Sequence, residues 1–290
     1  MLENQKGRCC YDHDEKNSDN ENSRTIATRF LAMRALHRKL GVEHLEELFW
    51  RCFVGFDFFH GSMFGADPKE KANLAPFLAF LLILGLGEVV AHLGDGRAFW
   101  VFNQPRYWVF PLQTVVCAVL LIRGWPYYEL RAPKKLLFSV GIGILALLLW
   151  IAPQEWLGAP QRTDGFDPTF FGATGWPYAA NLAVRFLRLV VIVPLLEEIF
   201  WRGFLLRYLI NEDFTRVPFG TFSWLSFGIV TAGFCIEHSP PDYPAAILTG
   251  MLYNLVAYRT RSLSSCVLTH AVTNALLGIY VLRTGQWGFW

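Results

Sequence analysis

Hydrophobic residues dominate the chain from about residue 75 onward, in segments long enough to cross a bilayer. About 20 apolar residues in a helix cover the hydrocarbon core, and we predict spans at about 75–93, 107–122, 136–152, 179–210, 222–238, 243–258 and 262–282. The segment 179–210 is longer than a span requires and contains Pro194, so we expect a tilt or kink there. The pattern predicts an all-α, polytopic membrane helix bundle of about seven to eight spans.

The N-terminal part of the chain follows a different pattern. Residues 1–23 lack apolar periodicity and are predicted to be a disordered polar tail. In residues 24–74, Ile26, Phe30 and Met33 recur at helical spacing among arginines, which predicts an amphipathic cytoplasmic helical segment. Such a helix either lies on an anionic membrane surface or packs on the bundle, and both alternatives stay open. Residues 75–290 are expected to form the transmembrane bundle.

Composition and charge support this division. Only 17% of the residues are charged, the mean hydropathy is +0.29 and the net charge is +2, which argues against a disordered chain, a coiled coil and a nucleic-acid-binding module. Residues 1–74 contain 23 of the 50 charged residues. The six cysteines form no C-x-x-C pair and suggest neither a disulfide framework nor a cysteine zinc site.

The distribution of Lys and Arg between the predicted spans indicates an orientation. Alternate loops are rich in basic residues, and loops of that kind stay in the cytoplasm. These residues are Lys69, Lys71, Arg123, Arg131, Lys134, Lys135, Arg207, Arg216, Arg259 and Arg261. We therefore expect a multi-pass membrane protein with its N-terminus in the cytoplasm and its C-terminus outside. The membrane itself is expected to be a bacterial inner membrane, which the charges do not decide.

Several ionisable residues fall at membrane depth, where each charge costs at least about 2.5–3.5 kcal/mol. Glu88 and His92 are four residues apart, so we expect them to satisfy each other. Arg185 and Arg188 lie near the outer end of their span, where we expect them to extend to the interface.

A second group of polar residues comes from three different spans and falls at compatible depths. Its members are Glu197, His238, His270 and Asn274. A shared, buried polar cavity accounts for their coincidence better than separate interhelical hydrogen bonds do. The group therefore predicts a catalytic site.

The spacing of these residues indicates their roles. Glu198 and Arg202 are four apart and are expected to form an internal pair, whereas Glu197 points about 100° away without a partner on its helix. A desolvated, unpaired carboxylate is suited to be a general base. His270 and Asn274 share a helix face, so one can contact a metal or water while the other stabilises an oxyanion.

Two neighbouring residues receive smaller roles. Phe234 is expected to pack beside His238. Glu237 could be an extra acid in the site, but we expect it to face a loop at the helix end. Asn254 receives no role.

Three motifs in this order resemble a known family. E-E-I-F-W-R (Glu197 to Arg202) resembles E-E-x-x-x-R, F-C-I-E-H (Phe234 to His238) resembles F-x-x-x-H, and H-A-V-T-N (His270 to Asn274) resembles H-x-x-x-N. They are typical of the CPBP family, which groups the type II CAAX prenyl endopeptidases with bacteriocin-processing and immunity proteins. The resemblance covers about residues 175–285.

The resemblance implies an intramembrane endopeptidase for a membrane protein or lipidated peptide, either prenylated or bearing a sorting tail. It assigns catalytic roles to Glu197, Glu198, His238, His270 and Asn274, with Arg202 and Phe234 as structural support. Glu197 would activate water, His238 and His270 would hold it, and Asn274 would stabilise the oxyanion.

The cofactor is not decided by the motifs. Glu197, His238 and His270 are a donor set that Zn²⁺ can use, but no H-E-x-x-H helix is present, and a metal-free mechanism stays open.

Two other function classes stay open at this point. One is a non-proteolytic binding, scaffold or immunity-type protein on the same fold. The other is a transporter, although no inverted repeat is visible. Membrane lipids are expected partners, and nucleic acids are not.

Overall fold

The computed structural model describes residues 67–94 and 99–290, which form helices and connecting loops. The helices are α4 (Pro68–Leu93), α5 (Trp100–Asn103), α6 (Arg106–Gly124), α7 (Leu136–Trp156), α8 (Gly175–Phe186), α9 (Val193–Glu198), α10 (Leu206–Tyr208), α11 (Trp224–Ile236), α12 (Tyr243–Thr260) and α13 (Leu263–Thr284). Between 67 and 94 and from 99 onward there are no strands, so the all-α prediction is confirmed.

The predicted polar tail and most of the predicted amphipathic segment, residues 1–66, lie outside the described residues. The described part begins at Asp67, whose side chain accepts a hydrogen bond from the Lys69 backbone N–H at 3.2 Å and so caps α4. Pro68 follows at the first helical position, where a missing N–H costs nothing. The first span therefore begins before residue 75.

Five described helical segments are long and apolar enough to cross a membrane: Pro68–Leu93, Arg106–Tyr127, Leu136–Trp156, Gly175–Tyr208 and Leu263–Thr284. The two other predicted spans are also helical. However, α11 has only 13 residues, and α12 is not among the five. The protein is a multi-pass membrane protein.

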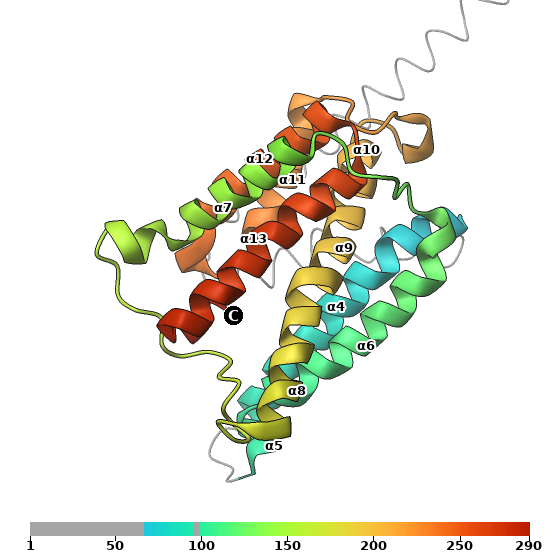
Figure 1. Ribbon diagram of the computed structural model, residues 1–290. Coiled ribbons are helices and arrows are strands. Elements are labelled where there is room, and N and C mark those ends of the chain that lie inside the picture. Colours follow the sequence, from blue (N-terminus) through green and yellow to red (C-terminus); the bar gives the residue numbers. More distant parts are fainter. Residues whose placement is uncertain (1–66, 95–98) are drawn as a thin grey trace, which may run out of the picture. The chain divides into compact units, whose positions relative to one another are not determined.

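The longest helical segment lies between two groups of helices (Figure 1). On one side α4 packs along α6, and on the other α7 packs along α13 while α11 packs along α12. The segment Gly175–Tyr208 contacts α4, α6 and α13. Residues placed on this segment therefore face both groups of helices.

Small residues bring α7 and α13 into close contact. A Cβ atom added to Gly143 would lie 2.7 Å from the Thr269 carbonyl oxygen, so only glycine fits at this position. The hydroxyl groups of Thr269 and Thr273 donate to the carbonyls of Ser139 and Gly143, at 3.1 and 3.0 Å. These contacts fix the face of α13 that carries His270.

A tight turn joins α12 to α13. Arg261 adopts a left-handed conformation with φ 49°, and the Ser262 side chain then caps α13 by accepting from the Ser265 N–H. The turn sets the register of α13.

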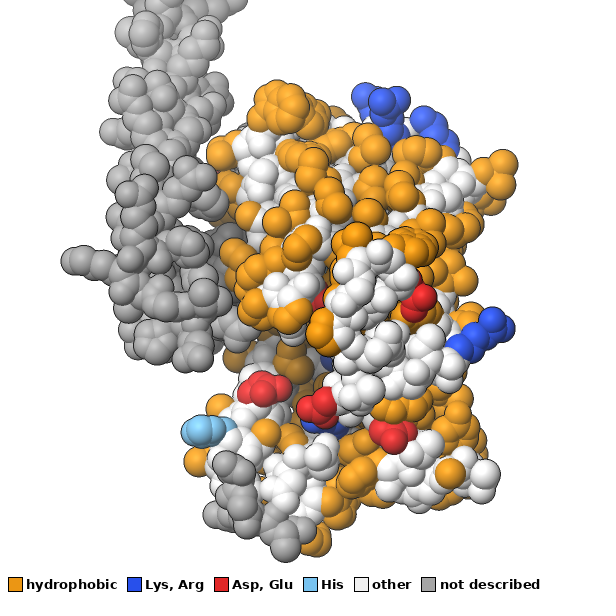
Figure 2. Space-filling model, turned by 90° about the vertical axis from the view of Figure 1, so that its left-hand side faces the viewer, with side chains coloured by type: hydrophobic (Ala, Val, Ile, Leu, Met, Phe, Trp, Pro, Cys, Tyr) orange, Lys and Arg blue, Asp and Glu red, His pale blue; other side chains and the backbone are white. Residues whose placement is uncertain are grey.

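The surface of the described bundle is largely hydrophobic (Figure 2). Large apolar side chains such as Leu137, Trp176 and Trp224 are 91, 81 and 79% exposed. Exposure on this scale is expected where lipid is the solvent.

Candidate active site

The long helical segment presents Glu197 and Glu198 between two π-helical turns. Leu187–Ile192 (η3) precedes α9, and Ile199–Leu205 (η4) follows it. Pro194 has no N–H to donate, and the wider π-helical turn ends two residues before it. The predicted irregularity at Pro194 therefore takes the form of a π-helical turn, which is frequent at functional sites.

Glu198 and Arg202 form the pair that their spacing predicts. Both side chains are fully buried, and Arg202 Nη1 donates to Glu198 Oε1 at 3.1 Å. Arg202 Nε also donates to Asn254 Oδ1 at 3.1 Å, and Nη2 donates to the Gly250 carbonyl at 3.3 Å. Asn254 in turn donates to Thr231 Oγ1 at 3.1 Å. Arg202 thus binds the long helix to α12 and α11, and Asn254 has a structural role.

Glu198 also holds His270 in place. His270 Nδ1 lies 3.0 Å from Glu198 Oε1, and because an ionised carboxylate only accepts, Nδ1–H is the donor. His270 is 5% exposed, and its ring lies between those of Phe234 and Tyr253, with centroids 6.3 and 5.0 Å away. In its neutral form the imidazole therefore presents the Nε2 lone pair to the site.

His238 follows α11 and is held in a similar way. Its Nδ1 lies 2.7 Å from the Phe234 carbonyl oxygen, so Nδ1–H donates and Nε2 carries the lone pair. The Phe234 ring packs beside it as expected, with a centroid distance of 4.9 Å, and Trp150 of α7 lies at 5.2 Å. The Phe234 ring also lies 6.3 Å from that of His270, so both histidines lie beside the same aromatic ring.

Glu197 is the least satisfied of the buried carboxylates. It is 5% exposed, and its Oε2 has no hydrogen-bond partner among the described residues. The site therefore contains a buried carboxylate oxygen that is free to accept a proton from water.

Glu237 does not face a loop, as the sequence interpretation preferred, because its side chain points to the long helical segment. Its Oε2 accepts from Trp201 Nε1 at 3.1 Å, and Trp201 is fully buried. The position of Glu237 next to His238 was the available signal, because the turn after α11 aims both side chains inward.

Asn274 lies one helical turn beyond His270 on α13. Its Nδ2 donates to the Leu189 carbonyl at 2.9 Å, within the π-helical turn η3. One of the two amide N–H groups is thereby engaged, and a primary amide has a second. Asn274 thus lies at the predicted interface between α13 and the long helix.

The other charged residues at membrane depth differ from expectation. Glu88 and His92 are both exposed and form no ion pair with each other, so the expected mutual pairing is wrong. Arg185 and Arg188 do not extend to the interface, because they are only 2 and 6% exposed. Their guanidinium groups lie over aromatic rings, among them that of Phe110, at 4.7 and 4.3 Å. The prediction assumed that water at the interface would solvate these guanidinium groups, but cation–π contacts stabilise them instead.

The described residues show no ready-made metal site. Within residues 67–94 and 99–290, no group of three or more His, Cys, Asp or Glu side chains is placed to hold a metal ion, and Glu197, His238 and His270 are therefore not arranged as such a group.

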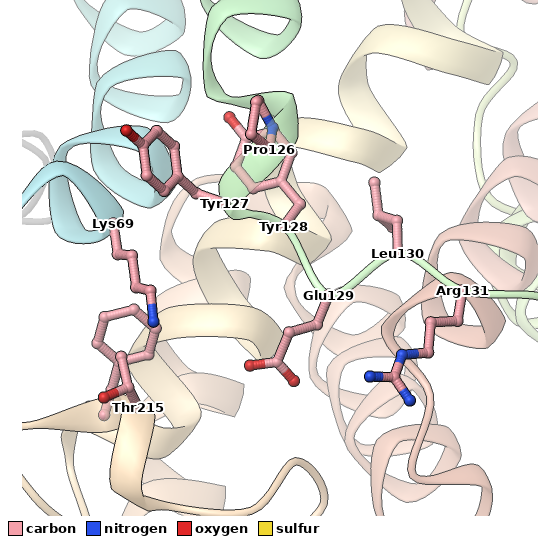
Figure 3. A pocket seen from close by; sticks show the side chains of 9 residues that line it. Lys69, Pro126, Tyr127, Tyr128, Glu129, Leu130, Arg131 and Thr215 are labelled. Atoms are coloured by element: carbon pink, nitrogen blue, oxygen red, sulfur yellow. The ribbon is translucent and has the colours of Figure 1, made fainter.

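A pocket of about 310 Å³ lies apart from this site, near the start of α4 (Figure 3). The loop after α6 contributes Glu129 and Arg131, and Lys69 reaches it from α4. Glu129 pairs with the buried Arg207 at 3.0 Å. None of the predicted catalytic residues lines this pocket.

Comparison with protein families matches residues 179–276 to the family Type II CAAX prenyl endopeptidase Rce1-like. The matched range is about a third of the chain and contains every residue of the candidate site. No curated protein and no solved structure matches the chain.

Proposed function

We propose that this chain, which carries a type II CAAX prenyl endopeptidase Rce1-like domain at residues 179–276, is an intramembrane endopeptidase that uses a glutamate-activated water. The single observation that carries the proposal is the buried Glu197 carboxylate, whose Oε2 has no hydrogen-bond partner among the described residues. Glu198 Oε2 has no partner either, but Glu198 Oε1 accepts from both Arg202 and His270, which accounts for Glu198 as a structural residue.

Each site residue has a defined part in the proposed reaction. The attacking water has two O–H groups. One O–H donates to Nε2 of His238 or of His270, whose Nδ1 atoms are already engaged, and the other O–H is directed at Glu197. Glu197 takes the proton of this second O–H as the water oxygen bonds to the peptide carbon. The free N–H of Asn274 stabilises the oxyanion that develops. The proton on Glu197 then passes to the leaving amine as the C–N bond breaks.

Zinc is not part of the proposed reaction. Glu198 occupies Nδ1 of His270 and is itself bound to Arg202, so it orients the histidine and acts through it. We expect purified, active protein to contain no stoichiometric zinc by elemental analysis and to keep its activity after treatment with a chelator.

The proposed substrate is a membrane protein or lipidated peptide, since the site is built among membrane-embedded helices. The proposed location is the bacterial inner membrane, and the loop charges support a cytoplasmic N-terminus and an outer C-terminus. Membrane lipids are the surrounding solvent, and the net charge of +2 offers no nucleic-acid surface.

The test compares wild type with Glu197→Gln, which keeps the size of the side chain and removes the base. Membrane-protein termini from cells that express each form identify the cleaved protein, and the corresponding peptide is then given to purified enzyme in liposomes. We expect cleavage by wild type and a rate lower by about 10²–10⁴-fold in the variant.

Glu88→Gln is the matched control, because Glu88 is a membrane-depth glutamate on the exposed surface of α4. It should cleave at the wild-type rate. Full activity of a folded Glu197→Gln variant would overturn the proposal, and wild-type cellular function in that variant would favour the binding or scaffold alternative.

A further inference from the structure

The pocket near the start of α4 lies at an edge of the membrane-spanning part of the bundle. It is enclosed by the start of the span Pro68–Leu93, the loop after the span Arg106–Tyr127 and the loop after the segment Gly175–Tyr208. Because one span begins and two end around it, the pocket is at the depth of the lipid headgroups. Its volume of about 310 Å³ is at the lower end of the range for small-molecule sites, so it can hold one headgroup-sized molecule.

Hydrogen bonds between the walls fix the shape of this pocket. The Tyr128 hydroxyl donates to the Ala72 carbonyl at 2.8 Å and fastens the loop after α6 to α4. The buried Arg207 donates through Nη1 to Glu129 Oε1 at 3.0 Å, and through Nε and Nη2 to the Phe214 carbonyl at 3.1 and 3.0 Å. Arg207 thereby joins the second wall to the third. A pocket built in this way is pre-organised, so a ligand does not have to order its walls.

Two cationic side chains at the pocket have no counter-ion. Lys69 reaches the pocket from α4 and Arg131 from the loop after α6, with the Glu129 side chain between them (Figure 3). Glu129 is the acidic residue of the lining, and its ion pair is with Arg207. Within residues 67–94 and 99–290, neither Lys69 nor Arg131 forms an ion pair. The pocket therefore offers uncompensated positive charge to an anion.

The acidic residues beside the pocket are engaged in local contacts. Asp213 pairs with Arg216 at 2.8 Å and accepts a hydrogen bond from the Thr215 hydroxyl at 2.6 Å. Asp67 caps α4 by accepting from a backbone N–H. These carboxylates therefore leave the two cations of the pocket available.

We propose that this pocket binds a phosphate group, with Lys69 and Arg131 as its two cationic partners. A guanidinium can donate to two phosphate oxygens at once, and an ammonium adds a compact point charge. The position favours the phosphate of an anionic phospholipid, because Trp125 and Tyr127 are exposed beside the pocket and such aromatic side chains are typical of headgroup depth. The headgroup enters the pocket while its acyl chains stay in the bilayer.

The proposed phosphate site goes beyond the proposed function and does not depend on it. None of the candidate catalytic residues lines the pocket. Its test therefore uses binding as the readout, and proteolytic activity enters no part of it.

Native mass spectrometry of the purified full-length protein in detergent measures the binding of added lipid. Phosphatidylglycerol should bind more tightly than phosphatidylcholine, because the choline cation is repelled by the two side chains. Lys69→Gln and Arg131→Gln should each raise the Kd for phosphatidylglycerol about fivefold, which is the effect of one cation near a membrane surface. Both residues are exposed, so the variants should fold, and an unchanged Tm without lipid checks this.

Lys71→Gln and Arg123→Gln are the matched controls. Both residues are exposed cations near the same ends of α4 and α6, and neither lines the pocket. Lys71 lies two residues beyond Lys69, which turns it by about 200° around the helix. The controls should bind phosphatidylglycerol as wild type does. Equal weakening in all four variants, no weakening in Lys69→Gln and Arg131→Gln, or equal affinity of wild type for the two lipids overturns the inference.

Glycerol 3-phosphate distinguishes the two sources of a phosphate group. If the site takes a headgroup anchored in the membrane, this soluble compound should fail to displace phosphatidylglycerol from wild type. Displacement from wild type, with direct binding that is weakened in Lys69→Gln and Arg131→Gln, would support the phosphate site and identify a soluble phosphate ester as its ligand.

Discussion

Two clusters of buried charge lie on the same long helix, and they are stabilised in different ways. Near its end, Glu198 and Arg202 neutralise each other and bind His270 and Asn254. Nearer its start, Arg185 Nε and Nη1 have no hydrogen-bond partner among the described residues, and the guanidinium lies over aromatic rings. The first cluster is stabilised by hydrogen bonds and ion pairs, whereas Arg185 in the second is stabilised by aromatic contacts.

The difference follows from the chemistry of the two kinds of ion. A guanidinium is weakly hydrated and planar, so aromatic faces can replace part of its water. A carboxylate has no such substitute and requires N–H or O–H donors. A buried carboxylate without donors, such as Glu197, is therefore a stronger indication of function than a buried arginine.

The largest effect on stability is expected at Arg202. Arg202→Ala removes one partner from a fully buried ion pair and leaves Glu198 with only His270 as a donor. The free energy of unfolding in detergent should fall by about 3–5 kcal/mol. If the free energy of unfolding falls by less than about 1 kcal/mol, the Glu198–Arg202 cluster depends on ion pairing no more than the Arg185 cluster does.

A smaller effect is expected at Gly233, which lies beneath Trp201. The Cβ of Gly233→Ala would come within 2.7 Å of the Trp201 ring, and displacing a packed ring should destabilise the protein by about 1–3 kcal/mol. The unfolding midpoint in detergent measures the effect.

Gly228→Ala is the matched control for this prediction. It lies on the same helix, α11, with nothing within 4 Å of the added Cβ, so it should leave stability unchanged or raise it by up to about 1 kcal/mol. Equal unfolding midpoints for the two variants would contradict the packing argument.

The sequence predicts the class of fold and the convergence of the motif residues, for reasons that are local. Apolar periodicity locates the helices, and the i, i+4 spacing of Glu198 and Arg202 implies their pair. The direction of Glu237 was missed because it depends on how the chain turns after α11. Arg185 was misplaced because its aromatic partners, among them Phe166 and Trp290, are distant in sequence.

The smallest effect is expected at Arg185, and it tests the comparison most directly. Arg185→Met replaces the guanidinium by an apolar side chain of similar length, which loses the cation–π contacts but also removes two buried N–H groups that have no acceptor. Because these two effects oppose each other, the free energy of unfolding should change by less than about 1.5 kcal/mol.

Arg188→Met is the control within the same cluster. Arg188 Nε donates to Gln113 Oε1 at 2.8 Å, and Gln113 is fully buried. Arg188→Met leaves this acceptor unpaired, so the free energy of unfolding should fall by about 1–3 kcal/mol. The unfolding free energies should therefore rank Arg202→Ala below Arg188→Met, and Arg188→Met below Arg185→Met. A loss at Arg185 as large as that at Arg202 would mean that Arg185 has an anionic partner, and the distinction between the two clusters would then be wrong.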